Sequence, residues 1–344
     1  MISTHQQKES IFITGATGYL GHSLANKLAS LGYEVKALVR DITPPSQSAE
    51  AISLDPAIKK VRGTLLDIDS FIAEVKGCTT LIHGAALVKV WIKEKSLFYK
   101  INVEALRELF QKANEIGVTK IIQISSFMTI GPSKNALLTE QHMHSEYSFC
   151  NDYERSKYLG DKTSEELIKG GYPIIRIYPG VIYGPGKLTD GNIVAKIIID
   201  YLQGKTPGII CGDSIWSYAY ITDVINGIIA AMQKGRTGER YILAGENKTL
   251  RELYSFISEL SHKKPLTINI PASIAYFIGS LYWIIAELFN KEPQFTHQVI
   301  NVFKQNWAFS SQKAIEELDY SITPFDSGMK NTFDWIINII HYKK

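Results

Sequence analysis

Apolar runs of strand length alternate with helix-like patterns along the first half of the chain. The strand-like runs lie at residues 11–13, 35–39, 80–83, 120–125 and 173–178. Leucines at helical spacing follow the first run, and helical patterns fall between most of the others. Such alternation is typical of a parallel sheet with helices on both faces. We therefore predict an α/β fold with a Rossmann-type, doubly wound parallel sheet over residues 10–184.

The alternation weakens after residue 184, where glycine, proline and longer apolar helices become prominent. This change predicts a smaller, mostly helical substrate-binding region at residues 185–214 and 246–344. A return segment at about 215–245 is assigned to the first domain.

One segment, residues 272–289, is apolar over its whole length and carries only Glu287 as a charge. A stripe of large apolar residues recurs in it at helical spacing: Ile274, Phe277, Ile278, Leu281, Ile284, Ile285 and Leu288. A bilayer span needs about 20 apolar residues, so the segment is slightly short. We predict a helix that packs on the core or lines an apolar pocket. The alternative is a helix in a membrane surface, flanked by Tyr276, Tyr282 and Trp283.

The composition narrows the class of protein. The chain has 344 residues, 45% of them hydrophobic and 21% charged, and a net charge of +3. No basic block stands out, so we expect no nucleic-acid partner. The polar opening MISTHQQKES lacks an apolar signal segment, which predicts a cytoplasmic protein, associated with a membrane only if residues 272–289 contact one.

Cysteine and histidine spacing predicts no metal site. The three cysteines, Cys78, Cys150 and Cys211, lie far apart, which indicates reduced structural thiols. His142 and His144 are two residues apart and have no nearby Cys or Asp companions, so we interpret them as part of a solvated loop.

The segment IFITGATGYLG at residues 11–21 carries the first chemical motif. A strand-like run enters the glycines and a helical pattern leaves them, as in a dinucleotide-binding turn. Backbone N–H groups of such a turn approach a pyrophosphate at the positive end of the helix. Gly15 and Gly18 would serve the turn and the approach, and Gly21 the packing of helix on strand. The predicted contacts of this turn also include Thr17, Tyr19 and Leu20.

The end of the predicted second strand should face the adenosine ribose, about 20 residues after the glycines. Val39 stands at the strand tip, where an acidic residue would accept a hydrogen bond from a ribose hydroxyl, and Arg40 follows it. A guanidinium can bind and neutralise a 2′-phosphate, so we predict NADP(H) in preference to NAD(H). Asp41 is the counter-argument, because it could neutralise Arg40 or turn toward a ribose itself.

Hydride transfer to a carbonyl also requires an acid-base group, which Tyr-x-x-x-Lys on a helix supplies. The two side chains share a helix face, and the ammonium is expected to lower the tyrosine pKa. Four such spacings occur, starting at Tyr153, Tyr158, Tyr183 and Tyr201. Glycine or proline interrupts the last two. The first two differ by about 140° around one helix, so only one can face a cofactor.

A serine favours the first of these pairs. Ser125 and Ser126 end the strand that begins at residue 120, at the carboxyl edge where open α/β sheets bind ligands. With this serine in view, seven segments together resemble the extended short-chain dehydrogenase/reductase family over residues 10–250. They are IFITGATGYLG at 11–21, LIHGAA at 81–86, Asn102-Val103, ISSFMTIG at 124–131, YERSK at 153–157, IIRIYPGVIYGPG at 174–186 and YITDV at 220–224.

The resemblance implies a role for each matching residue. Ser126 would orient the reacting oxygen, Tyr153 would act as general acid/base, and Lys157 would lower its pKa and bind the nicotinamide ribose. The remaining implied cofactor contacts are Asp67 and Ile68 at the adenine, Ala85, Ala86 and Asn102 at the sheet edge, and Pro179 and Val181 near the nicotinamide. A homodimer through a helix at about 95–116 is the assembly that the family suggests.

Departures from other branches of the family favour a reductase. Phe127 and Met128 stand where 4,6-dehydratases carry Asp-Glu, so dehydration by that route is not expected. Many sugar-nucleotide epimerases have asparagine in place of Pro179 and use arginines to clamp a second pyrophosphate. Beyond residue 190 the arginines are Arg236, Arg240 and Arg251.

The closest likeness is to the dihydroflavonol-4-reductase and 3-beta-hydroxysteroid-dehydrogenase-like branch. We predict an NADP(H)-dependent oxidoreductase that reduces a ketone, or oxidises a secondary alcohol, on a hydrophobic small molecule. The residues predicted to bind this substrate are Val88, Trp91, Phe127 and Tyr183. The alternatives are an NAD-dependent sugar-nucleotide epimerase and, less favoured because the catalytic pair is present, an NADP-sensing regulator without turnover.

Overall fold

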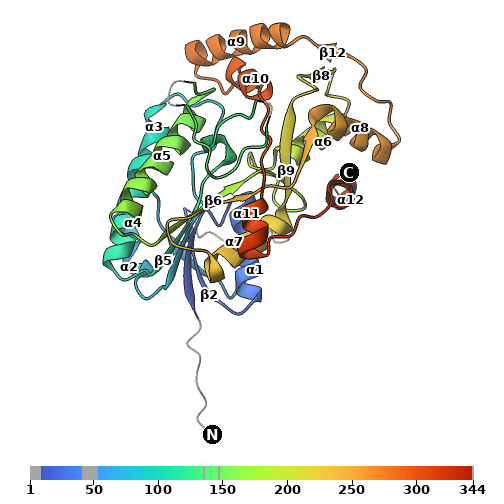
Figure 1. The fold of residues 1–344 in the computed structure, drawn as a ribbon. Coiled ribbons are helices and arrows are strands. Elements are labelled where there is room, and N and C mark those ends of the chain that lie inside the picture. The colour runs from blue at the N-terminus through green and yellow to red at the C-terminus, as the bar shows by residue number, and fades with distance from the viewer. Residues whose placement is uncertain (1–8, 41–52, 135, 146–147, 343–344) are drawn as a thin grey trace.

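A computed structural model describes residues 9–40, 53–134, 136–145 and 148–342. Its centre is a sheet of seven strands in the order β10-β6-β5-β4-β1-β2-β3 (Figure 1). All neighbouring strands in this sheet are parallel. The chain moves outward from β1 in both directions, so the strand order reverses between β1 and β4. The predicted doubly wound α/β fold is confirmed.

The bounds of this domain follow the apolar runs in the sequence. Its strands are β1 (Ser10–Thr14), β2 (Glu34–Val39), β3 (Lys59–Arg62), β4 (Thr80–His83), β5 (Lys120–Ile124), β6 (Ile174–Pro179) and β10 (Arg240–Leu243). Its helical elements are α1 (Tyr19–Ser30), η2 (Ile68–Ser70), α2 (Ile72–Val75), α3 (Ser96–Tyr99), the π-helical turn η3 (Lys100–Glu104), α4 (Ala105–Glu115), η4 (Phe127–Thr129), α5 (Asp152–Lys169) and α7 (Ile221–Lys234).

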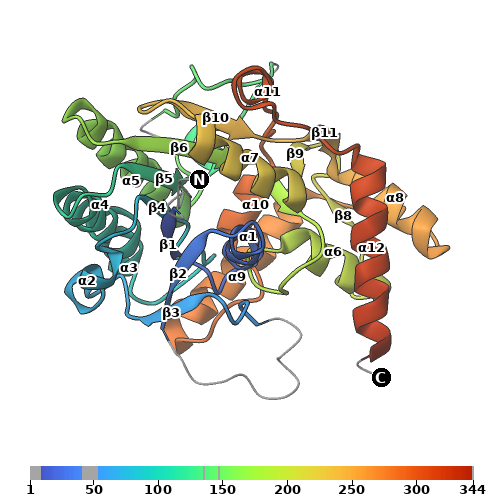
Figure 2. The ribbon, with the colours of Figure 1, turned by 90° about the horizontal axis from the view of Figure 1, so that it is seen from below.

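Helices cover both faces of the main sheet. One core lies between the sheet and α1, α7 and α11 (Gln312–Leu318), and a second between the sheet and α2, α4 and α5. Figure 2 shows these two groups of helices on opposite sides of the strands. Because both faces are covered, β1 is buried at all five positions, and its three central residues, Ile11, Phe12 and Ile13, are all apolar.

The second region has two small sheets and several helices. Its strands are β7 (Val181–Tyr183), β8 (Ile209–Ile210), β9 (Ile215–Tyr220), β11 (Glu246–Thr249) and β12 (Asn269–Ile270), paired as β11-β9-β7 and β12-β8. Its helices are α6 (Ile193–Leu202), α8 (Leu250–Ser261), α9 (Ala272–Phe289), α10 (His297–Phe303) and α12 (Phe325–Tyr342). Eleven of the 26 buried residues in the core between these elements are aromatic.

The chain crosses between the two regions more often than the pattern predicts. Within residues 215–245, α7 and β10 join the main domain, whereas β9 belongs to a small sheet. Helix α11, from the segment assigned to the substrate region, also packs on the main domain. Its Leu318 is 1% exposed there. A seven-residue helix carries too short a pattern for the sequence to reveal which core it completes.

Helix α9 has the predicted bounds and contributes Trp283 to a pocket, but the prediction that its apolar stripe packs on the core is wrong. The seven stripe residues are 39–72% exposed. The buried residues of the helix are the small ones, Ala275, Gly279 and Ala286. A Cβ on Gly279 would lie 2.6 Å from the nitrogen of His297, so close packing on α10 selects small residues for the inner face.

Candidate active site

The glycine turn between β1 and α1 excludes side chains at two positions. Gly15 has φ +82°, and a Cβ there would lie 2.7 Å from the Ala85 nitrogen. A Cβ on Gly21 would lie 2.2 Å from the Gly15 carbonyl oxygen. Gly21 therefore packs against the turn itself rather than against the strand, and both glycines are required by contacts within the protein.

Gly18 leaves room instead. A Cβ on Gly18 would meet only the Gly15 carbonyl oxygen, at 3.4 Å. Gly18 also precedes the first residue of the 12-residue helix α1, and no side chain caps that helix start. The N–H groups of the first turn and the positive helix end therefore face this space. These features fit a pyrophosphate, which the backbone of the turn would hold.

The other predicted residues of the turn differ in their surroundings. Thr17 is exposed and Leu20 is half-buried. Tyr19 is 3% exposed, and its hydroxyl donates a hydrogen bond of 2.8 Å to the carbonyl of Gly184. The Tyr19 side chain thus ties the turn to the second region, so that only its backbone could contact a pyrophosphate.

The predicted adenosine contacts lie along the same edge of the sheet. Arg40 is exposed directly after β2, while Asp41 lies outside the described residues. The Asp67 carboxylate accepts a hydrogen bond of 3.3 Å from the Ser70 N–H, and Ile68 is 2% exposed. These contacts shape the turn after β3, and a role in adenine binding stays a prediction.

Thr14 and His83 anchor the loop that follows β4. Thr14 Oγ1 lies 2.9 Å from His83 Nδ1 and accepts a hydrogen bond of 3.2 Å from the Ala85 N–H. Burial, with a smaller contribution from the charge of Lys157, lowers the pKa of His83 to about 3. His83 is therefore neutral, and it helps to hold Ala85 and Ala86 at the sheet edge.

Asn102 holds this loop from the other side. Its side chain accepts a hydrogen bond of 2.8 Å from the Leu87 N–H and donates one of 3.2 Å to the Leu87 carbonyl. It also donates to Ser156 Oγ at 2.9 Å. Asn102 is 4% exposed and lies within the π-helical turn η3. We therefore assign it to positioning of the loop, a role that a sequence motif does not distinguish from direct cofactor contact.

Ser126, Tyr153 and Lys157 meet at the carboxyl end of β5. Ser126 follows β5 and forms a side-chain hydrogen bond with Tyr153 of α5. Lys157 Nζ donates a hydrogen bond of 3.0 Å to the carbonyl of Ile124, the last residue of β5. The structure thus brings together the three side chains that the sequence selects as catalytic, beside the strand-order reversal.

The prediction that the Tyr153 pKa is lowered is wrong for the protein as described. Burial raises the pKa of Tyr153, and the hydrogen bond with Ser126 only partly opposes it. Burial likewise lowers the pKa of Lys157 to about 8, while the charge of Asp161 raises it in part. Burial disfavours the phenolate form of Tyr153 and the ammonium form of Lys157. The i, i+4 spacing in the sequence does not reveal how deeply the two side chains are buried.

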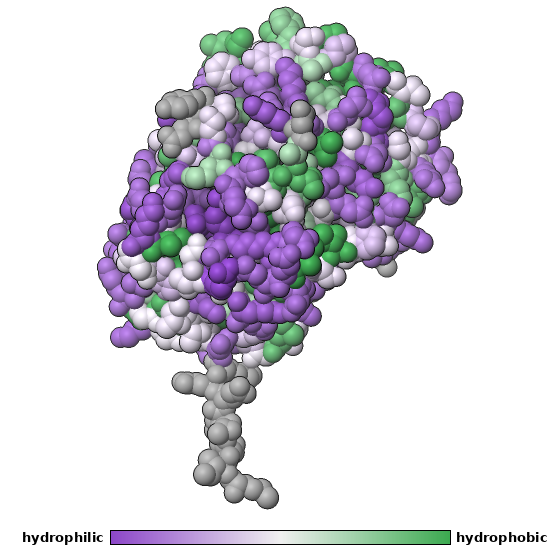
Figure 3. Space-filling model, viewed as in Figure 1, coloured by the Kyte–Doolittle hydropathy of each residue, from purple (hydrophilic) through white to green (hydrophobic). Residues whose placement is uncertain are grey.

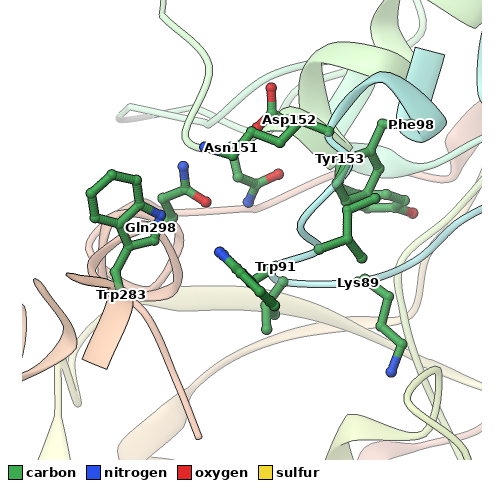
Figure 4. A pocket seen from close by; sticks show the side chains of 11 residues that line it. Lys89, Trp91, Phe98, Asn151, Asp152, Tyr153, Trp283 and Gln298 are labelled. Atoms are coloured by element: carbon green, nitrogen blue, oxygen red, sulfur yellow. The ribbon is translucent and has the colours of Figure 1, made fainter. Parts of the chain in front are cut away.

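A narrow pocket lies beside Tyr153, between the loop after β4 and helices α9 and α10. Figure 4 shows Trp283 and Gln298 on one side of it and Phe98 and Tyr153 on the other. The predicted Trp91 lines this pocket and donates a hydrogen bond of 2.9 Å to Glu287 Oε1 of α9. The sequence pattern does not indicate the other lining residues, because they come from four separate segments: Lys89, Val90, Ile92, Lys95, Phe98, Asn151, Asp152, Trp283 and Gln298.

The other predicted substrate residues lie elsewhere. Val88 is 42% exposed and precedes Lys89, the first pocket residue of the loop after β4. Tyr183 is 1% exposed and packs against Tyr220 and Phe325, so its prediction as a substrate contact is wrong. Phe127 belongs to the same aromatic core, where its ring lies 5.3 Å from that of Trp307. Of the three aromatic residues predicted to bind substrate, Trp91 lines the pocket, whereas Phe127 and Tyr183 belong to the core.

Pro179 and Val181 flank the turn between β6 and β7. Both are buried, and Val181 is 8% exposed. A Cβ on the intervening Gly180 would lie 2.6 Å from the Ser217 carbonyl oxygen, so the chain turns tightly against β9 here. Contact of these two residues with a nicotinamide stays a prediction.

The prediction of a solvated loop is wrong for His144. This side chain is buried and lies 2.8 Å from Glu154 Oε1, which is itself fully buried at the start of α5. Burial opposes the charge on His144, but its hydrogen bonds with Glu154 and the Ser145 carbonyl together raise its pKa. Tyr158 packs on the same imidazole, so the rival Tyr158/Lys162 pair occupies a different face of α5 from Tyr153. The partner of His144 is ten residues away, beyond the reach of a local motif search.

The three arginines beyond residue 190 are engaged within the protein. Arg236 bonds Glu317, Arg240 donates to the Tyr178 hydroxyl, and Arg251 bonds Asp213. Among the described residues, none of the three lines the pocket beside Tyr153.

Comparisons with known proteins identify the family and agree with the fold. The model of the NAD dependent epimerase/dehydratase family matches residues 11–244. The chain is 26% identical to sterol demethylase protein B of Methylococcus capsulatus over 94% of this chain and 97% of the relative. It is 24% identical to a putative dihydroflavonol 4-reductase of Synechocystis over 96% and 95%.

Solved structures show the same fold. The crystal structure of gox2253 superimposes with a TM-score of 0.79 at 29% identity, covering 96% of this chain and 99% of that one. A UDP-glucuronic acid 4-epimerase of Bacillus cereus in complex with NAD superimposes with a TM-score of 0.75 at 21% identity, over 96% and 99%. The chain belongs to the NAD-dependent epimerase/dehydratase family, within the extended short-chain dehydrogenase/reductase superfamily.

Proposed function

We propose that this enzyme reduces a ketone on an apolar small molecule with NADPH, or catalyses the reverse oxidation of a secondary alcohol. The observation that carries the proposal is the contact between Ser126 and Tyr153 beside a pocket with two tryptophans. A relative from Stigmatella aurantiaca, 25% identical over 79% of this chain and 80% of its own, is a ketoreductase for a farnesyl quinoline oxide. The substrate of that relative is a ketone that carries an apolar farnesyl chain.

In this reaction NADPH, when bound, supplies the hydride that reduces the carbonyl carbon. The Ser126 hydroxyl orients the carbonyl oxygen, and the Tyr153 hydroxyl donates the proton that converts this oxygen to an alcohol. The raised pKa of Tyr153 keeps the phenol protonated before the reaction. Lys157, with a pKa of about 8, is mostly protonated at neutral pH and would stabilise the phenolate until solvent returns its proton.

The aromatic part of the pocket supports a substrate with an apolar portion, beside the charged and polar side chains of Lys89, Lys95 and Asp152. Trp91, Phe98 and Trp283 contribute aromatic surface to it. The indole nitrogen of Trp283 is buried with no hydrogen-bond partner among the described residues, so it could donate to a polar group of the substrate. The engaged arginines supply no bidentate clamp for a second pyrophosphate, which counts against the epimerase alternative.

Arg40 supports the preference for NADPH. It is exposed at the tip of β2, on the sheet edge that the glycine turn also borders. A ribose 2′-phosphate there would gain charge-assisted hydrogen bonds from the guanidinium.

The test is NADPH oxidation measured over a panel of apolar ketones and, in parallel, UDP- and dTDP-sugars. We expect oxidation with at least one ketone, and about a 10²- to 10⁴-fold lower kcat in Tyr153→Phe. Tyr158→Phe, five residues along the same helix, is the matched control and should keep its activity. Ketone reduction that persists in Tyr153→Phe would refute the assigned acid. Conversion of a nucleotide sugar without net NADPH oxidation would overturn the proposal in favour of an epimerase.

A further inference from the structure

The outer face of α9 is the largest group of exposed apolar side chains on one element of the described chain. Eight large residues of α9 are at least 39% exposed: Ile274, Phe277, Ile278, Leu281, Ile284, Ile285, Leu288 and Phe289. The space-filling view has apolar residues at its top, where α9 lies in Figure 1 (Figure 3). Exposure of this extent marks an interaction site.

The distribution of residue sizes around α9 indicates what covers this face. Ala275, Gly279 and Ala286 pack inward, and large aliphatic and aromatic residues point outward. A helix in a water-soluble protein buries its large residues and exposes its polar ones. The inverse arrangement, with small residues at the helix-helix contact and large ones outside, is typical of a helix whose outer face is in lipid.

Charges around α9 fit the headgroups of a bilayer. Lys291 lies just after the end of α9, and Lys304 Nζ lies 5.0 Å from the ring of Tyr276 on α9, whereas the carboxylates of the same segment are Glu287 and Glu292. Both carboxylates form ion pairs with lysines of the loop after β4: Glu287 with Lys95 at 3.3 Å, and Glu292 with Lys89 at 3.1 Å. The unbalanced positive charge near α9 therefore complements anionic phospholipids.

α9 also connects this face to the pocket. Trp283 lines the pocket, and Glu287 accepts the hydrogen bond from Trp91 on its opposite side. The helix packs along α10 through Gly279, so it lies on the protein surface and does not extend away from it. One helix therefore has lipid-compatible residues outside and pocket residues inside.

We propose that α9 lies in the surface of a phospholipid bilayer and that the pocket beside Trp283 takes an apolar substrate from that bilayer. The second part rests on the proposed reductase function, whereas the first does not. One measurement is therefore made without cofactor or substrate, and another with both.

The first measurement is sedimentation of the full chain with vesicles of phosphatidylcholine, with and without phosphatidylserine. We expect binding to both vesicle types, several-fold stronger with phosphatidylserine. Phe277→Ser/Leu288→Ser should weaken binding to each type by about 100-fold, because each buried side chain contributes about tenfold or more. Leu31→Ser, at a residue 50% exposed just after α1, is the matched control and should bind as the unaltered protein does.

The second measurement compares a long-chain ketone dissolved in vesicles with a water-soluble short-chain ketone. The double variant should lose about tenfold or more in kcat/KM for the vesicle-bound ketone and keep its kcat/KM for the soluble one. Reduction of neither ketone by the unaltered protein, with vesicle binding intact, would refute the reductase function and leave the docking of α9 standing.

Three results would overturn the docking itself. One is equal vesicle binding by the double variant and the unaltered protein, with both folded by circular dichroism. Another is binding that occurs only with phosphatidylserine vesicles and is abolished by high salt, because lysines alone would then account for the binding. The third is no vesicle binding together with a dimer that the double variant converts to a monomer, which would show that a second copy covers the face.

Discussion

At the glycine turn, backbone atoms occupy the space that side chains would otherwise take, whereas on α9 large apolar side chains stand exposed. A Cβ on Gly21 would overlap the carbonyl of Gly15, but the side chain of Phe277 is 63% exposed. Residue type at the turn follows from contacts inside the chain. On α9 the exposed residue types do not follow from contacts inside the described chain, and we propose that a bilayer accounts for them. The two regions therefore respond differently to substitution: the first through stability and cofactor affinity, the second through association.

The largest loss of stability is expected at the buried pair of Glu154 and His144 at the start of α5. Glu154→Ala removes the partner of His144, and such a loss typically costs about 3 kcal/mol or more. The His144 pKa is higher in the folded state than in the unfolded state. Its pairing therefore contributes most below pH about 6.5 and is lost as pH rises through the raised pKa. Urea unfolding at pH 5.5 and pH 9 should show the larger deficit at pH 5.5.

Glu154→Gln serves as the control for this pair, because the amide keeps an acceptor near His144. It should lose less stability than Glu154→Ala. Equal unfolding midpoints for Glu154→Ala and the unaltered protein at pH 5.5 would contradict the pairing.

Two alanine substitutions within the glycine turn separate stability from binding. Gly21→Ala should lower the free energy of unfolding by about 3 kcal/mol, because the new Cβ overlaps backbone that cannot move aside. Gly18→Ala should change it by less than about 1 kcal/mol and weaken NADPH binding by about tenfold, because its Cβ enters the open space. Thermal unfolding and fluorescence titration with NADPH distinguish the two. Tight NADPH binding by Gly18→Ala would argue against a pyrophosphate at this position.

A tenfold effect confined to one cofactor is expected at Arg40. Arg40→Ala should raise the KM for NADPH about tenfold, since it removes charge-assisted hydrogen bonds to the 2′-phosphate. The KM for NADH should stay within about twofold, and Arg62→Ala, which ends β3, is the matched control. An equal rise for both cofactors would indicate that Arg40 does not recognise the 2′-phosphate.

The smallest effect on stability is expected on the outer face of α9. Leu281→Ser should change the free energy of unfolding by less than about 0.5 kcal/mol, since its side chain is 45% exposed. Thermal unfolding in the absence of lipid and detergent measures this. A loss of about 2 kcal/mol or more would show that the helix face packs on protein, and the contrast with the glycine turn would disappear.

Much of the fold and of the catalytic centre could be predicted from the sequence. The doubly wound sheet follows from apolar runs that are buried on both faces, and the bounds of α9 follow from its composition. Helix spacing reduced the candidates to two Tyr/Lys pairs and the strand end offered two serines; the resemblance to the extended short-chain dehydrogenase/reductase family then selected Ser126, Tyr153 and Lys157. Their pKa directions could not be predicted, because these depend on the protein that buries them.

Other parts of the site needed long-range information. Tyr183 precedes a glycine-rich segment and is enclosed in the core, whereas Trp91 precedes a polar segment and lines the pocket. The local sequence does not distinguish these two positions. Glu287 and Trp91 are 196 positions apart, and their hydrogen bond closes one side of the pocket. The hydrophobicity of a residue does not show whether its side chain is buried inside the protein or exposed on the protein surface, where a lipid bilayer could cover it.

The sequence by itself determined where the chain turns tightly, which segments are strands or helices, and which tyrosine and lysine share a helix face. These properties depend on backbone geometry and on residues a few positions apart. Only the tertiary structure decided that α11 completes the main core, that His144 is buried against Glu154, and that the apolar stripe of α9 faces outward. Each of those outcomes depends on contacts between distant segments, which local periodicity does not encode.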